Sequence, residues 1–141
     1  MRTNSLIIGL MTAAAFSFAC KRKVETTGGQ EVKVEEVKLG SAVGSDKRVV
    51  EETKSFAPND TIYVTVETQG NAPEATVTAR WKFENGQVVN ESTQRIVPTG
   101  AVATEFHLQK VDGFPEGKYK VEVLLNGQKV QEENFEVKRE T

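Results

Sequence analysis

Residues 75–97 read ATVTARWKFENGQVVNESTQRIV, and this stretch decides the fold. Apolar and polar residues alternate over 75–83, as they do along a β-strand that has one buried face. Asn85 and Gly86 follow this run. An Asn-Gly pair between two alternating runs is the strongest short-range signal for a hairpin, because both residues tolerate positive φ. The stretch therefore predicts two antiparallel strands, the second of them over residues 87–97.

The same alternation extends from this hairpin in both directions along the chain. Further alternating runs cover residues 32–39, 49–50, 62–66, 102–108, 119–125 and 130–137. Turn signals such as Pro58-Asn59-Asp60 and Asn126-Gly127 separate these runs at intervals of about 8–12 residues, the spacing of all-β sandwiches and barrels. The alternation slips by one at Glu35-Glu36 and again near Glu132-Glu133, which indicates two β-bulges. We therefore predict an all-β, antiparallel β-sandwich of seven to eight strands.

Two motifs within these runs resemble the immunoglobulin fold. Trp81 lies on the third main strand, where immunoglobulin domains often bury a Trp against the opposite sheet. GKYKV at residues 117–121 resembles the immunoglobulin tyrosine corner, in which a Tyr stands two residues before a core cysteine. Val121 takes the cysteine position here, and Pro115 replaces the Asp that often stands four residues before the Tyr. The resemblance implies an immunoglobulin-like sandwich whose core needs no disulfide.

A wider resemblance covers most of the chain after residue 30. A Pro-x-Asp turn within residues 56–63, the hairpin NGQVV at 85–89 and the strand GKYKV at 117–121 are similar to bacterial Ig-like and macroglobulin-type modules of exported proteins. This resemblance implies one Ig-like domain over residues 31–141. The shared motifs mark a fold and imply no catalytic activity.

The first twenty residues have the layout of a bacterial export signal. Arg2 supplies a positive charge, residues 6–19 are almost wholly apolar, and Cys20 precedes the basic triplet Lys21-Arg22-Lys23. The apolar run is shorter than the roughly 20 residues that a membrane-spanning helix needs. The segment resembles a bacterial lipoprotein signal peptide. That resemblance implies removal of residues 1–19 and attachment of acyl chains, palmitate among them, to Cys20.

A second fate for this segment follows from the residues before the cysteine. Ser17-Phe18-Ala19 places small residues where ordinary signal peptidase requires them, so cleavage there would release a soluble secreted or periplasmic protein. Cys20 is the only cysteine of the chain and therefore has no disulfide partner. By resemblance to enteric lipoprotein sorting, Lys21 in place of Asp favours the outer membrane. Residues 20–30 are polar and are interpreted as a lipidated tether, attached to the periplasmic or surface side of that membrane.

Composition narrows the classes of partner. Without residues 1–19 about 120 residues remain, enough for one domain that folds without disulfides. The formal net charge is −2, both signs are mixed along the chain, and no basic block exceeds residues 21–23. A nucleic-acid partner would require a basic footprint, so we expect none. We expect a monomeric domain held to the membrane by its lipid.

The titratable residues do not form a recognisable catalytic or metal motif. His107 is the only histidine and alternates with inward-facing neighbours, so it is predicted to face solvent. One His without a second thiol or imidazole favours neither nucleophilic catalysis nor zinc binding. Asp60 and Asp112 are weak candidates for a calcium site, and adjacent glutamates such as Glu132-Glu133 are interpreted as charges that protect sheet edges. No sequence feature predicts a cofactor.

Two features are candidates for contact with a partner. Polar side chains alternate on the outer face of one strand, and those of another strand are predicted beside them: Thr76, Thr78, Arg80, Lys82 and Glu84, with Thr65 and Glu67. Phe114 lies in the loop DGFPEG at 112–117, where it either contacts a partner or closes the end of the core.

These observations favour a non-catalytic envelope lipoprotein. The Ig-like domain is predicted to bind another envelope protein or a surface polymer. Two alternatives remain open: an accessory domain, sugar- or ligand-binding, of an enzyme system, and a structural subunit that assembles through an edge strand.

Overall fold

The alternating runs form nine β-strands in the computed structural model, which describes residues 31–140. Their bounds are β1 (Lys33–Val43), β2 (Val49–Glu52), β3 (Ser55–Phe56), β4 (Ile62–Asn71), β5 (Ala75–Phe83), β6 (Val88–Ile96), β7 (Thr99–Leu108), β8 (Gly117–Leu125) and β9 (Gln128–Val137). The count is nine rather than seven or eight: β2 corresponds to the predicted run 49–50, and the additional strand is β3, a two-residue piece that no alternating run predicted.

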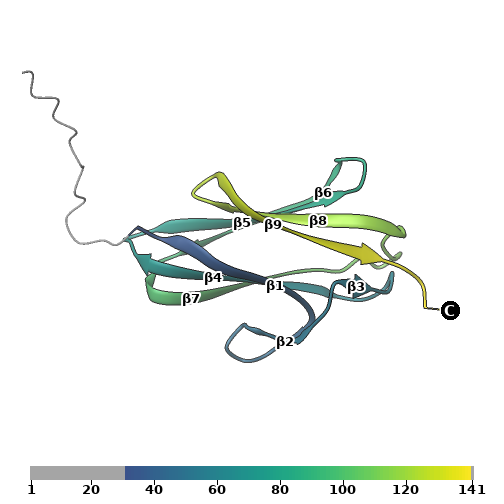
Figure 1. Cartoon of the computed structure of the whole chain (residues 1–141), viewed down its shortest axis with the longest axis horizontal. Coiled ribbons are helices and arrows are strands. Elements are labelled where there is room, and N and C mark those ends of the chain that lie inside the picture. Colours follow the sequence, from purple (N-terminus) through teal and green to yellow (C-terminus); the bar gives the residue numbers. More distant parts are fainter. Residues whose placement is uncertain (1–30, 141) are drawn as a thin grey trace, which may run out of the picture.

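The strands form two sheets that pack face to face (Figure 1). Sheet A has the order β2-β1-β4-β7, and sheet B has the order β3-β9-β8-β5-β6. The prediction of a wholly antiparallel arrangement is wrong for one pair, since β3 runs parallel to β9. The chain leaves sheet A after β2 and joins sheet B beside β9 for only two residues, in the same direction as β9.

The core lies between the sheets and consists of the predicted inward residues. Val64 and Val66 of sheet A and Val77, Val121 and Val123 of sheet B are fully buried. Aromatic rings fill one end of this layer in edge-to-face contacts, with ring centroids 5.9 Å apart for Trp81 and Phe135 and 5.7 Å apart for Phe135 and Phe56. Trp81 is only 1% exposed, which confirms its predicted place in the core.

Tyr119 forms the predicted corner at the start of β8. Its hydroxyl donates a hydrogen bond of 2.6 Å to the backbone carbonyl of Pro115, and its ring stacks on Phe135 with centroids 5.3 Å apart. Because the acceptor is a backbone carbonyl, Pro115 supports the corner although Asp is usual there. Burial, and to a smaller extent the charge of Glu84, raises the pKa of Tyr119, so the hydroxyl stays a donor.

The two Asn-Gly turns differ in their backbone conformation. Asn126 and Gly127 both have positive φ, at 51° and 82°, as the Asn-Gly signal predicts. In the β5–β6 hairpin only Gly86 has positive φ, at 85°, and the N–H of Phe83 donates to the carbonyl of Gln87 across a three-residue loop. A glycine in this left-handed conformation ends such a loop without steric cost.

The two predicted bulges lie in β1 and β9, but only one lies where the sequence placed it. The register of β1 against β4 shifts between Val34 and Glu36, which confirms a bulge at Glu35. In β9 the shift lies at Val130 rather than at Glu132-Glu133, because Lys129 and Gln131 oppose consecutive residues of β8. Val130 is 48% exposed. Because its side chain is apolar, the sequence pattern treats Val130 as an inward-facing residue, and the predicted bulge is therefore placed too far along the strand.

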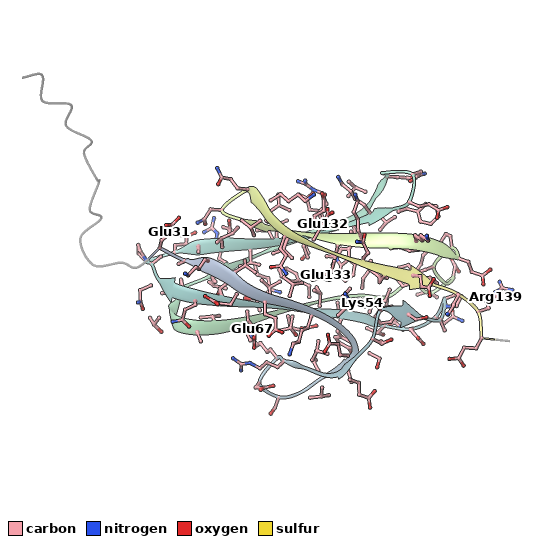
Figure 2. All side chains as sticks on the ribbon, viewed as in Figure 1. Glu31, Lys54, Glu67, Glu132, Glu133 and Arg139 are labelled. Carbon is pink, nitrogen blue, oxygen red and sulfur yellow. The ribbon has the colours of Figure 1, made fainter. Side chains whose placement is uncertain are left out.

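The glutamate pairs of β1 and β9 lie on stretches that have one paired neighbour each. Strand β2 pairs with β1 only from Gly40 onward, and β3 pairs with β9 only at Glu136 and Val137. Glu133 points toward Lys54 from the link between β2 and β3, with Oε2 and Nζ 3.1 Å apart (Figure 2). Charges on such stretches discourage pairing with another chain, as predicted.

The β1–β2 hairpin folds back over the outer face of sheet A. The Thr65 hydroxyl donates a hydrogen bond of 2.8 Å to the carbonyl of Lys47 in this hairpin's turn. Arg48, in the same turn, pairs with Glu67 and with Asp46. Thr65 is therefore buried although it points away from the core.

Candidate functional site

One lateral side of the sandwich is left open between the edge strands β6 and β7. Asn90 and Ser92 of β6 oppose Trp81 and Ala79 in register, so they belong to the inner face of sheet B. Both are nevertheless exposed, because sheet A ends at β7 and no strand covers this part of β6. Polar residues at these inward positions are consistent with a surface that is exposed to solvent.

A groove of about 450 Å³ lies at the end of this open side. Its walls come from the β5–β6 hairpin and from the loop between β7 and β8. The apolar part of the lining consists of Phe83, Val89, Leu108, Phe114, Pro115 and Tyr119. Its volume falls within the range of about 300–1,000 Å³ that is typical of small-ligand sites.

The rest of the groove lining is made of amides and one cation. Four amide side chains line it: Asn85, Gln87, Asn90 and Gln109. Among residues 31–140, Lys110 adds the one charge to this lining, and no carboxylate belongs to it. An amide offers both a donor and an acceptor. The groove therefore combines an apolar floor, in which Phe114 and Tyr119 are buried, with an exposed rim of four amides, which donate and accept hydrogen bonds, and one cation.

Two irregularities of the β5–β6 hairpin place this rim. The three-residue loop turns the chain at Gly86, and the N–H of Gln87 donates to Oδ1 of Asn85 at 2.9 Å, which leaves the amide NH₂ of Asn85 free of this contact. The register of β6 against β5 shifts so that Trp81 opposes Asn90 but Lys82 opposes Val88. This bulge leaves Val89 as the extra residue, and bulges of this kind re-aim side chains next to sites.

The floor of the groove is rigid. The rings of Phe83 and Tyr119 lie 4.9 Å apart between centroids, and Phe114 meets Tyr119 edge-on at 6.3 Å. A Cβ on Gly117 would lie 2.8 Å from a ring carbon of Phe83, so the backbone of β8 also fixes this ring. Phe114 is buried, which confirms that it closes the end of the core, and it also belongs to the groove lining.

A second feature is a charge cluster on the outer face of sheet B. Glu122 points away from the core on β8, yet its side chain is only 6% exposed. Its carboxylate oxygens lie 2.8 Å from Lys82 Nζ and 2.9 Å from Lys129 Nζ, while Arg80 is 4.0 Å away. The Oε1 atom has no hydrogen bond of good angle, so its contact with Lys82 is chiefly a pairing of charges.

This cluster fixes the protonation state of Glu122. Lys82 and then Lys129 lower the pKa of Glu122 to about 2, against the opposing effect of burial. A carboxylate with so low a pKa is a weak base and holds no proton near neutral pH. The cluster therefore has a structural role, because its ion pairs connect the neighbouring strands β5, β8 and β9.

Acid is expected to remove the stability that Glu122 contributes. A carboxyl group whose folded-state pKa is depressed stabilises the fold above its unfolded value of 4.5, and this contribution fades as the pH falls toward 2. Because Glu122 lies on an outer face, solvent screens its ion pairs, and we expect about 1–2 kcal/mol. Urea denaturation of wild type and Glu122→Gln measures this as a difference that is present near pH 6 and mostly lost near pH 2.

Glu91→Gln is the matched control for this measurement. Glu91 pairs with Arg80 at 2.7 Å on the same face but is itself exposed, so its loss is expected to cost under about 0.5 kcal/mol. An equal difference between wild type and Glu122→Gln at both pH values would contradict the assigned role.

The outward residues predicted to form one polar surface lie on two opposite faces. Thr78 and Arg80 belong to β5 in sheet B, whereas Thr65 and Glu67 belong to β4 in sheet A. The prediction that they lie side by side is wrong, because β4 pairs with β1 and β7 and not with β5. Thr78 is buried under its neighbours and shares a hydrogen bond of 2.8 Å with Thr93.

The other predicted site residues remain apart from the groove lining. His107 is exposed on β7 as predicted, 2.8 Å from Glu105 Oε1 and beside the ring of Tyr63. Asp60 accepts a hydrogen bond from the N–H of Ala57, so it serves the turn. Across residues 31–140 no three His, Cys, Asp or Glu side chains gather in a way that could hold a metal ion. Cys20 lies outside the described residues.

Within residues 31–140 no helix has the length and apolar character needed to span a bilayer.

Comparisons with known proteins support the fold. No family model matches the sequence, and no curated protein matches it. An immunoglobulin-like protein of Pseudomonas aeruginosa superposes with a TM-score of 0.54 and 12% identity, over 77% of this chain and 98% of its own. The alkylpurine DNA glycosylase AlkC of Pseudomonas fluorescens, bound to DNA containing an abasic site analogue, gives a TM-score of 0.48 and 14% identity. The match covers 77% of this chain and 31% of the glycosylase chain, and it carries no argument about function. The described residues thus form an immunoglobulin-like β-sandwich.

Proposed function

We propose that this chain is a non-catalytic cell-envelope lipoprotein of a bacterium. Acyl chains on Cys20 anchor it in the outer membrane, and its Ig-like domain binds another envelope protein or a surface polymer. The observation that carries the anchor is the placement of the sole cysteine between an apolar run and Lys21-Arg22-Lys23. More than one acyl chain is needed for stable anchoring, and the basic triplet suits anionic headgroups.

The placement of the groove supports a binding role that faces away from the anchor. Lys33 at the start of β1 opposes Gln69 at one end of β4, while Leu108 of the groove opposes Ile62 at the other end. Glu31 and Arg139 mark these opposite ends in Figure 2. Strand β4 has ten residues, so the groove lies about 30–35 Å beyond the tethered end of the domain.

The tether adds to this reach. The segment between Cys20 and Glu31 is ten residues long, and its covalent geometry limits its span to about 35 Å. A partner located beyond the headgroup layer is therefore within reach of the groove. A partner in the membrane plane would be met more readily by the tethered end.

Crosslinking from single positions in living cells tests this role. A photoreactive residue in place of Gln109 lies in the groove, and one in place of Gln128 lies beside the β8–β9 turn at the tethered end. We expect a product of higher mass from position 109 of the full-length protein and little from position 128. Equal products from both positions, or a product from position 128 alone, would contradict binding at the far end.

A further inference from the structure

The chemistry of the groove identifies a class of ligand. This inference rests on the proposed binding function and deepens it. Four amides line the groove together with apolar side chains that include Phe83 and Leu108, and within residues 31–140 the lining holds no carboxylate and a single cation, Lys110. A ligand that suits such a lining has an apolar face and many neutral groups that both donate and accept hydrogen bonds.

We propose that the groove is a saccharide site that takes part of an envelope glycan chain. A sugar ring presents C–H groups on its face and hydroxyls around its rim. The aromatic and aliphatic floor matches the face, and the amides of Asn85, Gln87, Asn90 and Gln109 match the rim. Lys110 can form an ion pair with a carboxylate if the glycan chain carries one. A neutral glycan also suits the groove, because the four amides bind hydroxyls.

The local backbone explains why these amides converge. Residues 83–90 include a three-residue turn and a bulge, although a two-residue turn and a regular ladder would suffice for a hairpin. The bulge brings Val89 into the lining beside Asn90, and the turn holds Asn85 through its Oδ1, which accepts from the N–H of Gln87 and leaves the NH₂ group free of that contact. Both irregularities serve the groove rather than the core, because Asn85, Val89 and Asn90 are exposed.

The same region disfavours a protein partner that would add a strand. A β-bulge interrupts the ladder of β6 at Val89, and bulges at edges discourage regular pairing. On the facing edge, the side-chain amide of Gln94 donates a hydrogen bond of 2.6 Å to the carbonyl of Glu105. A docking strand would need that backbone acceptor of β7. The glycan is therefore favoured over an extended peptide.

Titration of the full-length protein in detergent tests the saccharide site. The soluble probes are chitotetraose and cellotetraose, followed by calorimetry. Two natural sources are then distinguished by co-sedimentation with purified peptidoglycan sacculi and by titration with extracted surface polysaccharide. We expect binding to at least one probe and retention by one of the two natural polymers.

Two double variants separate the groove from the rest of the surface. Asn90→Ala with Gln109→Ala removes two exposed rim amides, so binding is expected to weaken tenfold or more. Asn134→Ala with Gln128→Ala removes exposed amides of β9, and binding is expected to stay within twofold of wild type. Thermal unfolding within a few degrees of wild type confirms that both variants are folded.

Two outcomes would overturn the saccharide site. One is equal binding by the groove variant and wild type, and the other is no binding to any of the four glycan preparations. If the glycans fail while position 109 crosslinks to a protein, the saccharide site is wrong and the binding role stands. If the glycans fail and position 109 yields no product, both proposals are wrong.

Discussion

Replacing Gly40 with alanine is expected to lower the free energy of unfolding by about 2–3 kcal/mol, because the new methyl group has no room. A Cβ at this position would overlap the carbonyl oxygen of Glu51 and Cγ1 of Val49, and would lie 3.1 Å from the carbonyl carbon of Glu51. A backbone oxygen cannot swing aside as a long side chain can. The clash lies between the two arms of the β1–β2 hairpin, so β2 would move away from β1 and the turn that contains Lys47 would lift from the outer face of sheet A.

The loss should be visible in local exchange as well as in global stability. Lifting the hairpin exposes Thr65, whose hydroxyl bonds to Lys47 in the turn, and frees Arg48 from Glu67. Hydrogen exchange of the amides in 40–52 should accelerate more than exchange in β5 or β8. Urea denaturation gives the global value.

Gly100→Ala is the matched control. Gly100 has φ of 94° but nothing lies within 4 Å of its Cβ position. Its substitution therefore isolates the cost of the left-handed backbone, which is about 1 kcal/mol. If Gly40→Ala is no more destabilising than Gly100→Ala, the close approach of the hairpin is not a constraint on the fold.

The fold could be predicted because its main strands have one buried face each. The alternation is strict over residues 75–83 and is broken over 119–125 only at Leu124, and both runs, like 62–66, lie in the middle of a sheet with neighbours on both sides. The sequence-based predictions are wrong where a strand lacks this regular alternation of buried and exposed residues. Val130 is an apolar residue on an exposed face, and β3 is too short to show a period.

The groove could not be predicted because its parts lie far apart in the sequence. Asn90 lies on β6 of sheet B, whereas Gln109 lies in the loop that follows β7 of sheet A, and the bulge at Val89 leaves no mark in the pattern QVVNES. One signal was available. Asn90 and Ser92 are polar at positions that pair with buried residues of β5, which indicates that β6 is uncovered on its inner side.

Glu122 was missed for a different reason. The run VEV at 121–123 alternates as any half-exposed strand does, so nothing in it marks Glu122 as a buried carboxylate. Its burial comes from cations on neighbouring strands, Lys82 of β5 and Lys129 of β9. Which residues pair across neighbouring strands depends on the strand order and on the register. The sequence pattern predicts the strands but not the order in which they lie in the sheet, so these ion pairs could not be predicted.

Cys20→Ala is expected to abolish lipid attachment altogether. Acylation of a lipoprotein requires the thiol of this residue, and the chain has no other cysteine to replace it. Without acyl chains the domain keeps only the weak attraction of Lys21-Arg22-Lys23 for headgroups. The variant should therefore leave the membrane fraction, while its Ig-like domain remains folded.

Metabolic labelling of cells with a fatty acid that carries a detectable tag is the most direct measurement of this anchor. We expect label on wild type and on Lys21→Ala, which keeps the thiol, and none on Cys20→Ala. Fractionation of the same cells should place the two labelled proteins with the outer membrane and the unlabelled variant in the soluble fraction. Label on Cys20→Ala, or its absence from wild type, would contradict a lipoprotein anchored at Cys20.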